Sequence, residues 1–178
     1  MLGHGAGGGV AAPDLVAAAD PALSVDLAVA LVEQPYRVAG RRSPPPAPRL
    51  DAAWTVIVDD LAAHELAGLA LVTGGRSSGA RVACRTAAAT AAVGVLCLAF
   101  PLQPAARAGA TPRPSRLPEL EAVTVPVLIV QGERDPFGMP EEAPGRTVVR
   151  VSGDHSLKTD MVTQREAVGT WLAELLAG

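Results

Sequence analysis

Short apolar runs alternate with amphipathic segments along most of the chain. Each run is continuously apolar or nearly so, which is typical of parallel strands covered by helices on both faces. The runs that predict strands are Leu27–Val32, Leu69–Thr73, Val93–Phe100, Val125–Val130 and Thr147–Val151.

Helical patterns fill the spaces between these runs. The last one places Val168, Trp171, Leu172 and Leu175 on one stripe, which we expect to pack against a sheet. The predicted helices are Asp14–Ala19, Asp51–Leu66, Ser77–Ala89 and Asp160–Leu176. The alternation predicts one α/β domain over residues 1–178, a doubly wound, mostly parallel sheet with helices on both faces.

Two segments are predicted to be loops because proline and arginine are frequent in them. They are Gln34–Pro48 and Pro101–Pro118. In an open α/β sheet, ligands bind beside the carboxyl ends of the strands, where such loops gather.

Charge and cysteine content narrow the function classes. The formal net charge of −3 argues against a nucleic-acid partner, because binding to phosphates requires positive charge. Cys84 and Cys97 lie in apolar stretches without metal-ligand spacing. We therefore expect buried free thiols, no metal and no cofactor.

The segment Thr86–Ala106 carries no charged residue and has about the length of a membrane span. Gly94, Pro101 and Pro104 interrupt it, which favours a helix end followed by a buried strand. No signal peptide is visible at the start of the sequence. The expectation is a cytoplasmic protein that does not enter a membrane.

A glycine-flanked serine is the clearest chemical motif. Gly74–Gly79 reads GGRSSG between an apolar run and a helical pattern, the context of a G-x-S-x-G nucleophile elbow. Ser77 is then the nucleophile, while Gly75 and Gly79 must be small for steric reasons. The backbone N–H of Ser78 would form half of an oxyanion hole.

An acid and a base follow in the order that this arrangement requires. Asp135 lies in a turn just past Val125–Val130, with Glu133 as the second candidate acid. His155 follows the last predicted strand and is the candidate base. Ser77, Asp135 and His155 together predict a catalytic triad.

A glycine-rich turn occupies Gly3–Gly9. Such a turn allows a backbone N–H, that of Ala6 or Gly7, to approach a substrate oxyanion as the other half of the hole.

The same segment permits a second interpretation. Gly3, Gly5 and Gly8 form a formal G-x-G-x-x-G, and Glu33 ends the next strand where a ribose-binding acid would lie. Dinucleotide binding is therefore an alternative, although it leaves Ser77, Asp135 and His155 unexplained.

The first predicted loop offers a candidate substrate rim. Tyr36, Arg37, Arg41 and Arg42 are able to recognise an acidic substrate there. The competing interpretation is a solvated loop with surface ion pairs.

With these residues identified, the chain resembles the α/β-hydrolase superfamily, and most closely small bacterial members related to testis-expressed protein 30 and to dienelactone-hydrolase-type enzymes. This resemblance implies the triad above and a serine hydrolase that acts on a small-molecule ester, thioester or related acyl bond. The matching segments are the His4–Gly9 turn, Glu33–Arg42 (EQPYRVAGRR), Gly74–Arg81 (GGRSSGAR), Phe100–Pro104 (FPLQP), Gly132–Gly138 (GERDPFG) and Gly153–Ser156 (GDHS).

The resemblance also implies an N-terminally shortened fold. Related hydrolases carry strands ahead of the glycine turn, whereas only Met1–Gly3 could contribute to that strand here. Either the functional protein begins upstream of Met1 or the sheet has a gap, and a gap predicts self-association through unpaired strand edges. A non-catalytic scaffold that uses this fold for protein binding is the remaining alternative.

Overall fold

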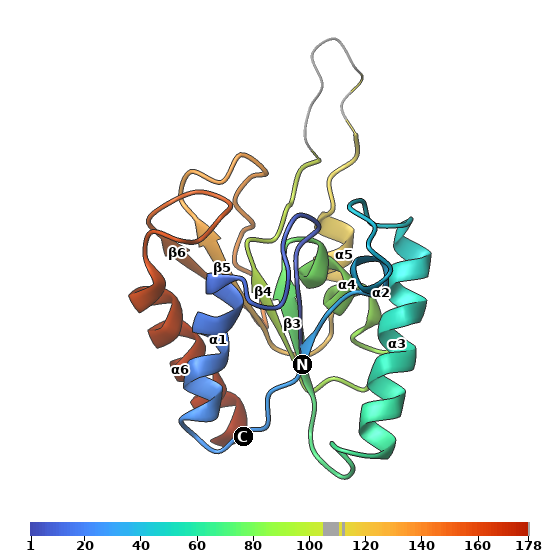
Figure 1. The fold of residues 1–178 in the computed structure, drawn as a ribbon. Helices are drawn as coiled ribbons and strands as arrows, with labels where there is room; N and C mark the ends of the chain where they lie inside the picture. Colours follow the sequence, from blue (N-terminus) through green and yellow to red (C-terminus); the bar gives the residue numbers. More distant parts are fainter. Residues whose placement is uncertain (105–110, 112, 178) are drawn as a thin grey trace.

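The computed structural model describes residues 1–104, 111 and 113–177 (Figure 1). Strands and helices alternate along the chain. They are β1 (Leu2–Gly3), α1 (Pro13–Leu23), β2 (Leu31–Val32), α2 (Pro35–Val38), α3 (Ala47–Ala63), β3 (Val72–Arg76), α4 (Ser78–Thr86), β4 (Gly94–Leu98), α5 (Leu117–Glu121), β5 (Val127–Gly132), β6 (Arg146–Val151) and α6 (Met161–Ala177).

The six strands form one parallel sheet in the order β2-β1-β3-β4-β5-β6. From β1 the chain first moves to one side, to β2, and then crosses to the other side, to β3 and beyond. The direction of winding therefore reverses between β1 and β3, and the carboxyl ends of these two strands flank the crevice where such sheets bind ligands.

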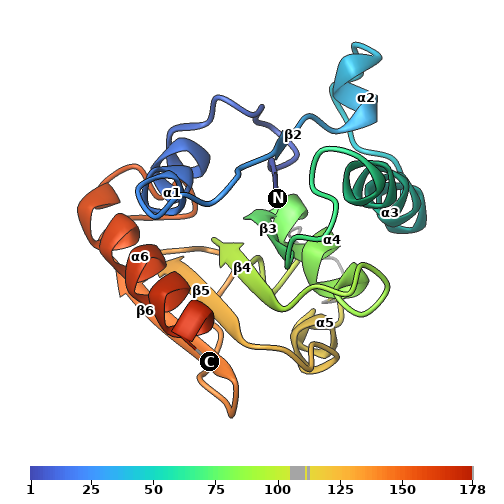
Figure 2. The same ribbon diagram turned by 90° about the horizontal axis from the view of Figure 1, so that it is seen from below.

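Helices cover both faces of the sheet, as the alternating pattern predicts. Figure 2 shows α1 and α6 side by side on one face, and α3, α4 and α5 on the other. The expected doubly wound α/β architecture is therefore confirmed.

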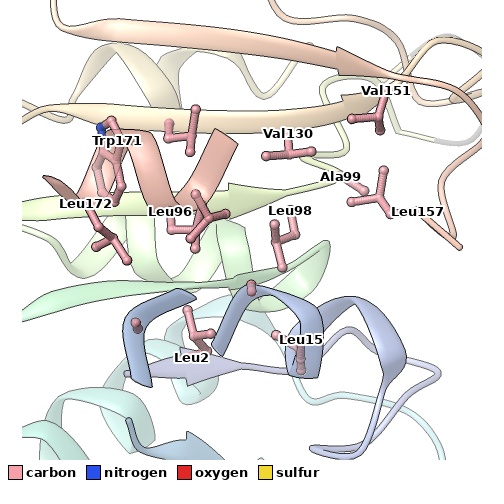
Figure 3. Close-up of a cluster of buried hydrophobic side chains, with 14 residues drawn as sticks. Leu2, Leu15, Leu96, Leu98, Ala99, Val130, Val151, Leu157, Trp171 and Leu172 are labelled. Atoms are coloured by element: carbon pink, nitrogen blue, oxygen red, sulfur yellow. The ribbon is translucent and has the colours of Figure 1, made fainter. Parts of the chain in front are cut away.

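The central strands are apolar on both faces because both faces are buried. On β4, Leu96 and Leu98 pack into the core beneath α1 and α6 (Figure 3). Val95 and Cys97 point the other way, into the core beneath α4 and α5. This alternation explains the continuous apolar run that predicted the strand.

Three further sequence predictions hold. The α6 stripe is buried, with Val168 and Leu172 in the core. Cys84 and Cys97 are free, buried thiols. The apolar segment after Thr86 is a helix end followed by β4, and no helix in the described part of the chain has the length and apolarity to cross a bilayer.

The boundaries of several strands and loops differ from the prediction. β2 contains only Leu31–Val32 of the predicted run Leu27–Val32, and β3 starts later, at Val72. The first proline-rich loop contains the short helix α2, and α5 begins at the end of the second, because proline is well tolerated in the first turn of a helix. The part of the Pro101–Pro118 prediction that covers 105–110 and 112 lies outside the described residues.

The start of the chain enters the sheet. The N–H of Leu2 donates to the carbonyl of Ala30, and β1 lies between β2 and β3. β1 is short, and next to it, towards the amino ends of β2 and β3, lies an apolar cavity of about 620 Å³. Its lining includes Leu27, Val29 and Leu71. β1 thus connects β2 to the carboxyl-terminal half of β3. Self-association through unpaired strand edges at the amino ends of β2 and β3 stays a prediction.

Candidate active site

Ser77 occupies a sharp turn between a strand and a helix. β3 ends at Arg76 and α4 begins at Ser78, so Ser77 is the single residue that joins them. Its backbone has φ 50° and ψ −104°, an unfavourable conformation for a residue with a side chain. The Ser77 N–H donates to the carbonyl of Leu98 at 2.9 Å, which ties the turn to β4.

The flanking glycines are required because the backbone of β1 passes directly over the turn. A Cβ atom on Gly75 would lie 2.2 Å from the Gly3 carbonyl oxygen, and a Cβ on Gly79 would lie equally close to it. The steric prediction for Gly75 and Gly79 is therefore confirmed, and the colliding group is the backbone of Gly3.

The structure brings the serine, histidine and aspartate side chains together. Ser77 Oγ lies 2.9 Å from His155 Nε2, and His155 Nδ1 lies 2.8 Å from Asp135 Oδ2. Because Nδ1 faces a carboxylate, we assign its proton there, which leaves Nε2 to accept the Ser77 hydroxyl proton. The Asp135 side chain is 1% exposed, whereas the His155 side chain is 18% exposed.

Asp135 is held by groups that the sequence analysis did not identify. Gln131 Nε2 donates to Asp135 Oδ2 at 2.9 Å and also reaches the carbonyls of Phe100 and Gly138. The N–H of Phe137 donates to Asp135 Oδ1 at 2.9 Å. A glutamine directly after the apolar run Val125–Val130 was the only sequence signal for this support.

Two other acidic residues, the alternative candidate Glu133 and the neighbour of His155 in sequence, Asp154, do not contact the imidazole in the described structure. Glu133 is exposed, and Asp135 holds the place next to His155. Asp154 is exposed, and hydrogen bonds from Ser156 lower the pKa of its carboxyl. Geometry thus separates Asp135 from its neighbours.

An aromatic ring covers the histidine. The Phe137 and His155 ring centroids lie 4.5 Å apart at an interplanar angle of 67°, an edge-to-face contact. The sequence motif GERDPFG contains Phe137, but no pattern in the sequence predicts that it touches His155.

The glycine turn lies beside Ser77. A Cβ on Gly5 would lie 3.5 Å from the Ser77 Cβ. His4 is fully buried and supports the turn: its Nε2 accepts the Gln34 N–H, and its Nδ1 contacts the Gly5 carbonyl. Ala6 and Gly7 follow directly along the chain, and Ser78 is the first residue of α4. Their oxyanion-hole role stays a prediction.

The candidate rim divides into buried and exposed parts. Tyr36 is 6% exposed, burial raises the pKa of its phenol, and its hydroxyl donates to the Ala6 carbonyl at 3.2 Å. Tyr36 therefore supports the glycine turn. Arg41 and Arg42 are exposed, Arg37 is half-buried, and substrate binding by these arginines stays a prediction.

The geometry of the glycine turn does not favour dinucleotide binding. In that fold the third glycine of the motif opens the helix, whereas α1 begins only at Pro13, well past Gly8. The close backbone approach at Gly3 is made to Gly75 and Gly79 of the same chain.

Comparisons with known proteins give a consistent result. The sequence profile of an alpha/beta hydrolase domain matches residues 1–174. No curated protein matches the sequence significantly. Among solved structures, the chain is similar to Est1E from Butyrivibrio proteoclasticus, with a TM-score of 0.75, 17% identity, and coverage of 99% of this chain and 87% of that one.

Two further bacterial proteins of known structure are also similar. An α/β serine hydrolase without a lid from Xanthomonas campestris gives a TM-score of 0.71, 17% identity, and coverage of 97% and 81% of the two chains. A serine hydrolase homologue from Coxiella burnetii gives 0.70, 15% identity, and coverage of 97% and 85%. At such identities the likeness establishes the fold.

Proposed function

Because the chain belongs to the alpha/beta hydrolase domain family, we propose that it is a serine hydrolase that cleaves an ester, thioester or related acyl bond of a small molecule. The observation that carries this proposal is the continuous contact from Ser77 Oγ through His155 to Asp135 at 2.9 and 2.8 Å. Buried Asp135 orients the imidazole, and the strained turn presents the Ser77 hydroxyl.

In the proposed reaction, Ser77 Oγ attacks the acyl carbon while His155 Nε2 takes the hydroxyl proton. The electron pair of the C=O bond moves to its oxygen and forms a tetrahedral oxyanion. When that pair returns, the bond to the alcohol or thiol breaks, and His155 gives its proton to the leaving group. Water then attacks the acyl-enzyme in the same way and releases the acid.

The oxyanion would be stabilised from two sides of Ser77. The Ser78 N–H lies at the first residue of α4, where helix N–H groups have no partner within the helix. The second donor would come from Ala6 or Gly7 in the turn that packs beside Ser77. Each donor of this kind contributes about 10²–10³-fold to kcat.

The test is labelling of the purified protein with a fluorophosphonate probe, combined with hydrolysis of short p-nitrophenyl esters. We expect labelling that Ser77→Ala abolishes, whereas Ser78→Ala retains it because that change keeps the backbone N–H. Because Est1E is described with ferulic acid bound, a feruloyl ester belongs in the substrate panel.

Two outcomes would decide against the proposal. Labelling that survives Ser77→Ala would exclude Ser77 as the nucleophile. A folded preparation that neither reacts with the probe nor turns over any ester would favour the scaffold alternative.

A further inference from the structure

Arg76 contacts three segments that meet at the candidate active site. It is the last residue of β3 and directly precedes Ser77. Its Nη2 donates to the His155 carbonyl at 2.9 Å, and its Nε lies 2.7 Å from Asp14 Oδ2. Its Nη1 would lie 2.9 Å from a Cβ on Gly5, so the guanidinium also packs against the glycine turn.

The Asp14 end of this contact is firmly anchored. Asp14 is 2% exposed and lies in the first turn of α1. Its carbonyl accepts a hydrogen bond from Gln164 of α6 at 2.6 Å, which joins it to the helix that follows the histidine loop. The Asp14 carboxylate and the Arg76 guanidinium are close enough for an ion pair, but their alignment does not meet the criteria of a hydrogen bond.

The histidine loop needs such support. His155 lies between β6 and α6, outside regular secondary structure, and its imidazole must stay within 2.9 Å of Ser77 Oγ. At the start of the loop, the Gly153 carbonyl accepts a hydrogen bond from the backbone N–H of Arg134, which follows β5. The hydrogen bond from Arg76 to the His155 carbonyl fixes the backbone at the histidine itself.

We propose that Arg76 is a positioning residue, which holds the backbone of His155 against the anchored carboxylate of Asp14 and so keeps the imidazole in line with Ser77. This inference rests on the proposed function. Arginine suits the task because its planar fork carries five N–H donors and can serve several acceptors at once, whereas a lysine ammonium is a flexible point donor.

The first experiment compares Arg76→Met with Arg85→Met. We expect Arg76→Met to lower kcat about 10- to 100-fold with little change in KM, because a misplacement of about 1 Å disrupts proton transfer without removing a substrate contact. Arg85 is a matched control: its side chain is also 18% exposed, and it pairs with Asp51 and Glu119. Its substitution should lower stability but leave kcat near that of the original protein.

A double variant separates positioning from stability. Arg76→Met alone leaves the buried Asp14 carboxylate without its partner, which is destabilising. Arg76→Met combined with Asp14→Leu replaces the buried ion pair by apolar groups, a change that is often neutral for stability. We expect the double variant to regain thermal stability while kcat stays low, and Arg76→Lys to retain part of the activity. If kcat returns together with stability, Arg76 has only a structural role and the inference is wrong.

Hydrogen exchange gives a readout that does not depend on catalysis. The amides of residues 153–157 should exchange faster in the double variant than in the original protein, and unchanged exchange would overturn the inference. An original chain that resists the fluorophosphonate probe would count against the proposed function alone. An active original chain with an equally active Arg76→Met variant would count against Arg76 alone.

Discussion

Substitution of Gly79 by alanine tests how closely the glycine turn must pack on the turn that holds Ser77. The new Cβ would lie 2.2 Å from the Gly3 carbonyl oxygen and 2.6 Å from its carbon. Close C···O contacts are about 3.3 Å, so the two backbones must separate by about 1 Å. Because Gly3 is paired with both β2 and β3, it has little freedom to move away.

The expected effect follows from two opposing contributions. Overpacking costs up to about 3 kcal/mol, and alanine gains about 1 kcal/mol over glycine in a helix. The unfolding free energy should therefore fall by about 2 kcal/mol, which lowers the Tm by about 4–8 °C in a chain of this size. Displacement of the turn by 1 Å should also slow ester hydrolysis about 10²-fold.

The assay pairs thermal denaturation with fluorophosphonate labelling rates, and Gly169→Ala is the control. Gly169 is also helical, but its new Cβ would meet only the Cβ of Pro21 at 3.4 Å, an ordinary contact. This control should be stabilised by up to about 1 kcal/mol and keep its activity. A Gly79→Ala variant as stable and as active as Gly169→Ala would refute the packing argument.

Three further predictions address the acid, pH dependence and the amino-end cavity. In a p-nitrophenyl ester assay, Asp135→Asn should lower kcat about 10⁴-fold without changing the fold. Glu133→Gln, at an exposed site, should retain activity. The opposite result would make Glu133 the acid. Burial raises the pKa of Asp14 above its usual 3.8 despite the Arg76 charge, so the native chain binds more protons there than the unfolded chain. The Asp14 contribution to the unfolding free energy must then fall as pH rises from 3.8 through the native pKa, and urea denaturation of Asp14→Asn should lack this slope. Leu69 lines the amino-end cavity and is 59% exposed, so it offers a site to test self-association. Leu69→Lys should shift the mass measured by light scattering towards that of the monomer. An original chain that is already monomeric at all concentrations would contradict the prediction.

The sequence alone was sufficient for the architecture because burial on both faces of a parallel sheet leaves a local signature. The runs Val93–Phe100 and Val125–Val130 indicate central strands without any knowledge of their neighbours. The glycine spacing around Ser77 is likewise local, since it reflects a turn whose flanking residues must be small. The chain order serine, acid, histidine then left few combinations of residues for the proposed triad.

Tertiary structure decided everything that depends on contact between distant segments. β1 has two residues, too few for a hydrophobic period, and becomes a strand only because β2 and β3 lie on either side of it. The choice of Asp135 over Glu133, and the contacts of Gln131, Phe137 and Arg76, likewise depend on which loop ends meet. Ser77 and His155 are 78 positions apart, and their 2.9 Å contact follows from strand order. Hydrophobic periodicity encodes which face of a segment is buried but not which segment becomes its neighbour, so these contacts appear only once the sheet is assembled.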